Sequence, residues 1–151
     1  MNAQALLQEI NANELTYEAS ALIAWELGFV SNAEDVAEFM YRGGPFPPQA
    51  SAKPPQSLED RRPDKKYWQF VKQEMHTFLC MDDERYRELW KQIDALQNKT
   101  TTTLVGVIAA FLGASLGAPA TLVAGFVAVC LYAAVKLGKE AFCSYIAHNR
   151  A

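Results

Sequence analysis

The feature that most constrains this chain is a run of 36 residues, 100–135, without a single charged side chain. Within it, 25 of the 32 residues in 104–135 are hydrophobic. An α-helix rises about 1.5 Å per residue, so an unbroken helix over those 32 residues would be about 48 Å long. The hydrocarbon core of a bilayer is only about 30 Å thick. One straight transmembrane helix is therefore too long, and the segment has to turn back on itself.

The turn is predicted near Gly117, Ala118 and Pro119, close to the middle of the segment. Glycine commonly ends a helix, and proline is well placed at the start of the next one. We therefore predict a helical hairpin with arms over Thr101–Leu116 and 119–137.

Basic residues flank this hairpin on both sides, and the turn contains none. They are Arg85, Arg87, Lys91 and Lys99 before it, and Lys136, Lys139 and Arg150 after it. Lys and Arg next to membrane segments stay on the cytoplasmic side, and two spans satisfy both basic flanks at once. Residues 100–137 are thus predicted to form two transmembrane helices with both termini cytoplasmic. Tyr132, Lys136 and Lys139 would lie at the membrane interface.

Small residues recur along the hairpin at helical spacing, which lets helix backbones approach closely in lipid. The predicted helix-packing positions are Gly106, Gly113, Gly117, Ala120, Ala124 and Ala128. They favour tight pairing within the hairpin or between copies, and hence a homo-oligomer in the bilayer.

The alternative is a soluble all-helical protein in which the hairpin is the buried core, because helices that are apolar all round also occur in protein interiors. A chain of 151 residues offers limited surface to enclose two such helices. Both interpretations remain open at this stage.

The rest of the chain is expected to form about five short helices, which makes the fold all-α. Residues 1–42 form an acidic helical unit, since residues 1–50 carry seven acids and one base. Six of the seven prolines lie in 43–63, a predicted linker or loop. Residues 64–99 read as an amphipathic helical hairpin, and 138–151 as a cytosolic tail. Ser31 and Glu34 have the spacing of a helix capping box.

Three cysteines are too few for a disulfide framework, so a reducing compartment and unpaired thiols at Cys80 and Cys143 are expected. If the apolar hairpin returns the chain to its starting side, a tetrahedral zinc site could form from His76, Cys80, Cys143 and His148. Their spacings match no common zinc module. We therefore predict neither a metal nor a cofactor.

No nucleophile elbow, glycine-rich phosphate loop or paired-carboxylate motif is present, so the protein is predicted to be non-enzymatic. Its net charge of −3 argues against a nucleic-acid partner. The leading prediction is a small membrane protein: a cytosolic helical unit that binds a protein partner, joined to a self-associating hairpin that anchors it or perturbs the bilayer. This layout, and only the layout, is similar to that of small bacterial membrane effectors and toxin-like proteins. The alternative function is a soluble interaction or regulatory protein.

Overall fold

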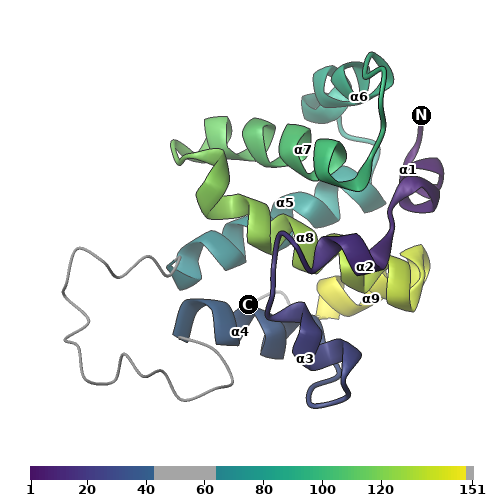
Figure 1. The fold of residues 1–151 in the computed structure, drawn as a ribbon. Helices are drawn as coiled ribbons and strands as arrows, with labels where there is room; N and C mark the ends of the chain where they lie inside the picture. The colour runs from purple at the N-terminus through teal and green to yellow at the C-terminus, as the bar shows by residue number, and fades with distance from the viewer. Residues whose placement is uncertain (43–63, 149–151) are drawn as a thin grey trace.

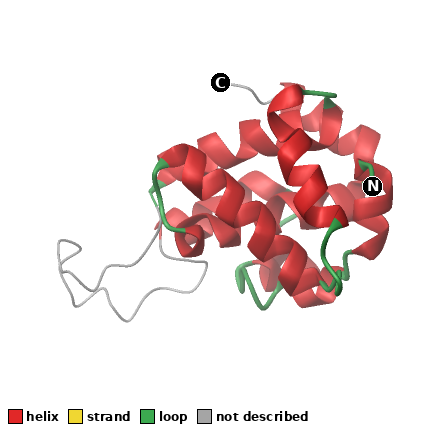
Figure 2. Ribbon diagram, turned by 90° about the horizontal axis from the view of Figure 1, so that it is seen from above, coloured by secondary structure: helices red, strands yellow, loops and turns green. Residues whose placement is uncertain are grey.

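The computed structural model describes residues 1–42 and 64–148, and in these two ranges every regular element is helical (Figures 1 and 2). The predicted all-α class is confirmed for this part of the chain. The predicted linker, 43–63, lies outside the described residues. The elements are α1 (Ala3–Glu9), α2 (Ala12–Leu15), α3 (Leu22–Glu26), α4 (Ala33–Arg42), α5 (Lys65–Cys80), the 3-10 helix η2 (Glu84–Tyr86), α6 (Arg87–Asp94), α7 (Thr101–Leu116), α8 (Ala120–Leu137) and α9 (Lys139–His148).

The apolar hairpin forms where the sequence predicts it, as α7 and α8. Thr100 caps α7 by accepting a hydrogen bond from the Thr103 amide at 3.2 Å. Gly117 ends α7 with a φ of +80°, a conformation that side chains with a Cβ rarely adopt. A Cβ on Gly113 would lie 2.6 Å from the carbonyl oxygen of Ala118, so the tight turn needs glycine there too.

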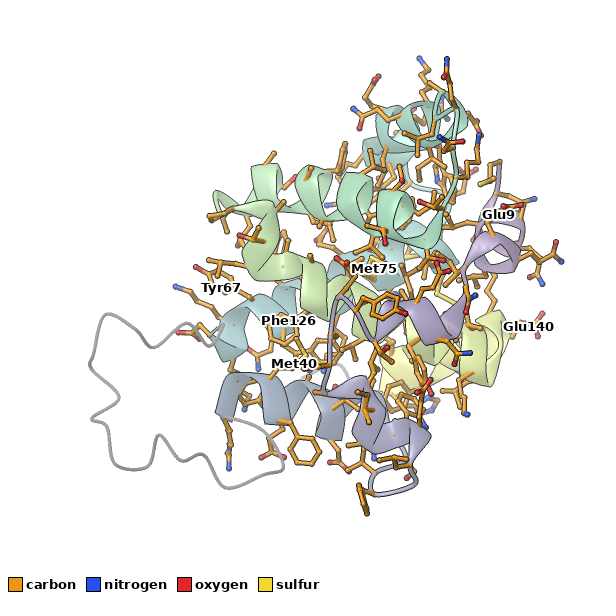
Figure 3. The ribbon with its side chains drawn as sticks, in the orientation of Figure 1. Glu9, Met40, Tyr67, Met75, Phe126 and Glu140 are labelled. Carbon is orange, nitrogen blue, oxygen red and sulfur yellow. A yellow bond between two sulfur atoms is a disulfide. The ribbon has the colours of Figure 1, made fainter. Side chains whose placement is uncertain are left out.

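Helix α8 runs through the centre of the molecule (Figure 1). It packs against α1, α2, α4, α5, α7 and α9, and every residue in 125–134 is buried. Trp25 and Trp68 reach it from two sides, with ring centroids 5.0 Å from Tyr132 and 5.6 Å from Phe126. Met75 and Phe126 lie inside, whereas Glu9 and Glu140 point outward (Figure 3). The helices before α8 in the chain therefore supply most of its cover.

The prediction of two transmembrane helices is wrong in number. Among the described residues only α8 is long and apolar enough to span a bilayer, and 56% of it is buried inside the protein. The 16 residues of α7 would extend about 24 Å, short of the hydrocarbon core. Hydropathy depends on composition alone, and a core helix wrapped by amphipathic neighbours has the same composition as a membrane span.

The amphipathic helices begin at acidic or amide side chains. Asp64 accepts from the Lys66 amide at 2.9 Å and starts α5, and Asp83 accepts from the Arg85 amide at 2.9 Å and starts η2. At α4 the cap is Asn32, which accepts from the Asp35 amide at 2.8 Å, so the predicted Ser31 capping box does not form. The Glu34 carboxylate is instead engaged by α5.

Two packing relationships differ from expectation. Helix α6 lies mainly against α7 and meets α5 at one end, where the rings of Phe78 and Trp90 stack at 4.5 Å. Residues 139–148 of the expected tail form α9, which fully buries Phe142 and Ile146 against α5 and α8. All described segments thus contribute to one hydrophobic core.

Candidate functional site

The most unusual surface of the molecule lies around α3, where four large apolar side chains face solvent. Tyr17 is 80% exposed, Ile23 45%, Leu27 64% and Phe29 69%. We call these four residues the α3 patch. Single exposed apolar side chains are ordinary, but four of them within residues 17–29 make this segment the candidate for an interaction surface.

The backbone fixes this patch in place. Leu27 is the C-cap of α3, and Gly28 follows with a φ of +85°. The Gly28 and Phe29 amides donate to the carbonyls of Trp25 and Ala24 at 3.0 and 2.8 Å. This hydrogen-bond pair is the Schellman motif, which satisfies the free carbonyls at a helix end. Leu27 and Phe29 are therefore held outward by an ordered turn.

The opposite side of α3 anchors it to the core. Leu22 is fully buried, and Trp25 is 7% exposed and packs on Tyr132 of α8. Ile23 and Leu27, four residues apart, project from the other side of the helix. The patch thus rests on a rigid inner face and has no covering element among the described residues.

The surroundings of the patch are acidic. Glu14, Glu18 and Glu26 form no ion pair with any described residue. The chain has no base before Arg42, and that guanidinium lies 3.1 Å from the Glu38 carboxylate. The residues that neighbour the α3 patch in the sequence therefore carry only negative charges, and a base that approaches α3 from another element is Lys136, next to the Tyr132 ring on which Trp25 packs.

A second polar cluster joins α4, α5 and α9 beneath the surface. Glu34 accepts from the Trp68 indole at 3.1 Å and from the Lys72 ammonium at 2.7 Å. The Glu34 amide donates to the Tyr145 hydroxyl at 3.3 Å. Burial raises the pKa of Tyr145 to about 12 and also raises the pKa of the fully buried Cys130 thiol, which favours the protonated form of both groups. The cluster joins α4 to α5 and α9 through these hydrogen bonds.

The structure brings Cys80 and Cys143 together, but as a disulfide whose Cα atoms are 5.9 Å apart. The predicted unpaired thiols are wrong, because α8 returns the chain so that α9 packs beside the end of α5. His148 lies close in sequence to Cys143, and its Nδ1 is 2.8 Å from the Ser144 carbonyl oxygen. In 1–42 and 64–148, no three or more His, Cys, Asp or Glu side chains form a group that could hold a metal ion. The set of His76, Cys80, Cys143 and His148 considered from the sequence is therefore not such a group.

The predicted helix-packing residues do not share one face. Gly106 lies on the exposed side of α7, with nothing within 4 Å of a Cβ placed there. Gly113 and Gly117 shape the turn, and Ala128 is in the core, while Ala120 and Ala124 are half-buried.

The predicted interface residues differ in their burial. Tyr132 is 1% exposed inside the bundle. The Lys136 ammonium lies 5.9 Å from the centroid of the Tyr132 ring, while Lys139 starts α9.

The α3 patch was not predicted from the sequence. The available signal was Leu27 and Phe29 on either side of Gly28: a helix ending there cannot turn both side chains toward its own core. Comparisons of the chain with protein-family models, with curated proteins and with solved structures find no match.

Proposed function

We propose that the protein is a non-enzymatic helical interaction protein whose α3 patch docks a basic, amphipathic segment of a partner protein. The observation that carries this proposal is the exposure of Leu27 and Phe29 on an ordered turn. Apolar side chains held in fixed positions lose little entropy on binding, so their burial is translated efficiently into affinity.

The charge around the patch selects the partner's chemistry. Glu14, Glu18 and Glu26 would attract Lys and Arg, while the apolar side chains would contact a hydrophobic stripe. An amphipathic helix with leucines four residues apart and lysines beside them presents both features together.

The test uses a synthetic 18-residue Leu/Lys helix as the probe, with a Leu/Glu helix of the same pattern as its control. We expect the Leu/Lys helix to bind more weakly as salt rises, and the Leu/Glu helix not to bind. The double variant Leu27→Ser/Phe29→Ser should lose at least about tenfold in affinity, since each buried apolar side chain is worth roughly 1.5 to 3 kcal/mol.

A matched control is Met81→Ser/Leu137→Ser, which removes two side chains of similar exposure, 54% and 43%, outside the patch. This control should bind as the unmodified protein does. Equal affinity of both double variants for the Leu/Lys helix would overturn the proposal.

A second candidate function, membrane association through α7 and α8, is supported by one observation. The outer face of α7 carries no charged residue, although Thr102, Gly106, Ala110 and Ala114 on it are exposed. In this proposal the outer helices open, the hairpin enters the bilayer, and copies of it associate. Carbonate-resistant binding to phosphatidylcholine–phosphatidylglycerol vesicles would support it, and recovery of all protein in the soluble fraction would remove it.

We further propose that the folded bundle works in an oxidising compartment. Disulfides persist in such compartments and are rare in the reducing cytosol. The Cys80–Cys143 bond is the support for this location. Alkylation of the protein directly in cell extracts should modify neither cysteine without prior reduction, and modification of both would instead support the cytosolic location.

A further inference from the structure

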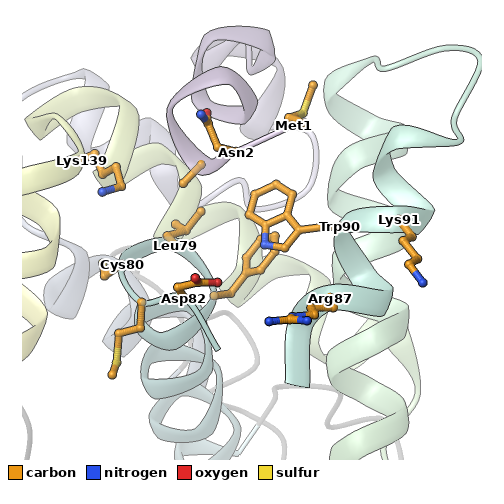
Figure 4. Close-up of a pocket in the computed structure, with 12 residues that line it drawn as sticks. Met1, Asn2, Leu79, Cys80, Asp82, Arg87, Trp90, Lys91 and Lys139 are labelled. Atoms are coloured by element: carbon orange, nitrogen blue, oxygen red, sulfur yellow. The ribbon is translucent and has the colours of Figure 1, made fainter. Parts of the chain in front are cut away.

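A groove of about 560 Å³ lies on another part of the surface, between the ends of α1, α5, α6 and α9. Its size falls in the range of clefts that hold small molecules. Figure 4 shows Trp90 in the middle of this groove, with Lys139 on one side and Arg87 on the other. The Cys80–Cys143 disulfide ties α5 to α9 at the same place, and Cys80 lines the groove.

One part of the groove is apolar and aromatic. Phe78, Leu79 and Trp90 line it, and the Trp90 ring is fixed by its stack on Phe78 at 4.5 Å. The indole is only partly buried, so part of its surface is open to a ligand. A flat ring would find an aromatic partner here.

The polar part of the groove consists mainly of hydrogen-bond donors. Arg87, Lys91 and Lys139 contribute three positive charges against one negative charge, from Asp82. Lys91 and Lys139 form no ion pair with a described residue, and Arg87 approaches Glu84 only at 3.7 Å. The Trp90 indole N–H donates to no group in 1–42 or 64–148. Donors without acceptors favour a ligand that brings its own negative charge.

We propose that this groove binds a small soluble aromatic anion, such as an aryl carboxylate. Its ring would lie against Trp90, its carboxylate would accept hydrogen bonds from Arg87, and Lys139 would add a positive charge from the other side of the groove. Guanidinium binds carboxylate with two parallel hydrogen bonds, which gives Arg87 the larger share of the specificity.

The test is a titration of the full chain with 2-naphthoate, in which Trp fluorescence and calorimetry measure the affinity. The controls are 2-naphthylmethylammonium, with the same rings and the opposite charge, and decanoate, which has the charge without the rings. We expect 2-naphthoate to bind more tightly than either control. Equal or tighter binding of the ammonium compound, or no binding of 2-naphthoate, would overturn the proposal.

Two variants should change the affinity for 2-naphthoate in opposite directions. Arg87→Gln/Lys139→Gln should weaken 2-naphthoate binding by about tenfold or more, since it removes a charge-assisted hydrogen bond donor and a second positive charge from the groove. Asp82→Asn should strengthen it, because it removes the only acid in the groove lining. Weaker binding to Asp82→Asn would contradict an anion site.

The matched control is Lys65→Gln/Lys66→Gln, which removes two positive charges at the far end of α5. This control should bind 2-naphthoate as the unmodified protein does. A loss of affinity as large as that of Arg87→Gln/Lys139→Gln would show that binding depends on net charge alone, and would overturn the proposed site. Leu27→Ser/Phe29→Ser should also bind 2-naphthoate normally. The groove and the α3 patch can therefore fail independently.

Discussion

The two arms of the charge-free hairpin have nearly the same composition but different surroundings. Helix α8 is buried on all sides over 125–134, whereas α7 buries one stripe and exposes Thr102, Gly106, Ala110 and Ala114. In α7 the buried residues recur every three or four positions, as on a half-exposed helix of a soluble protein. Apolar composition therefore predicts that a helix is buried, but the number of helices packed against it determines how much of its surface is buried.

The largest difference between the arms should appear when a charge is introduced into each. Ala128→Arg places an unpaired guanidinium in the core and should cost more than about 3 kcal/mol, enough to unfold most of the protein. Ala110→Arg lies on the exposed face of α7 and should change stability by no more than about 0.5 kcal/mol. Urea denaturation followed by circular dichroism measures both. Similar losses in the two variants would mean that α7 is enclosed as fully as α8.

The second prediction concerns the disulfide, which joins two of the helices that cover α8. The bond closes a loop with a sequence separation of 63 residues. Cys80→Ser/Cys143→Ser should lower the free energy of unfolding by about 2 to 4 kcal/mol, chiefly by freeing the unfolded chain. Denaturation of the unmodified protein with and without dithiothreitol should reproduce the difference. An unchanged midpoint on reduction would show that the cover of α8 does not depend on this bond.

The third prediction is a pair of glycine substitutions with opposite signs. A Cβ at Gly113 meets the Ala118 carbonyl oxygen at 2.6 Å, so Gly113→Ala should destabilise the hairpin by about 1 to 3 kcal/mol. Gly106→Ala adds a Cβ in open space within a helix and should stabilise by about 0.5 to 1 kcal/mol. Thermal denaturation distinguishes the two. Stabilisation by both variants would contradict the tight α7–α8 turn.

The fourth prediction concerns the rates at which cysteines on the two arms react with a thiol reagent. Cys130 is fully buried on α8, so in the disulfide-intact protein it should react with a maleimide roughly a hundredfold or more slowly than a free thiol, because reaction requires opening of the core. A cysteine introduced on α7 by Ala110→Cys should react as an exposed thiol does. Mass spectrometry over time gives both rates. Rapid labelling of Cys130 would show that α8 is transiently open to water.

Much of the local structure could be predicted from the sequence. The all-α class, the arm Thr101–Leu116 and the turn at Gly117 and Pro119 follow from signals that act within a few residues. The burial of α8 inside the protein could not be predicted, because it depends on whether distant residues such as Trp25 and Trp68 contact this helix. Hydropathy contains no information about those contacts.

The same limit applies to the functional surfaces. Cys80 and Cys143 were expected to come close if the hairpin returned the chain, yet spacing alone did not indicate that they would bond. The α3 patch depends on which side of a five-residue helix meets the core, and so short a helix has too few apolar positions to define a face. The groove combines residues from four elements, so no local motif could have marked it.

The position of α8 along the chain has a consequence for biosynthesis. Residues 120–137 leave the ribosome after α1–α7, although several of those helices bury their apolar sides on α8. Until then Trp25, Trp68 and their neighbours lack their contact with α8. The nascent chain therefore exposes hydrophobic surface of the kind that chaperones recognise. Assembly of the interior is thus deferred until α8 has emerged, because that one helix supplies the contact the others share.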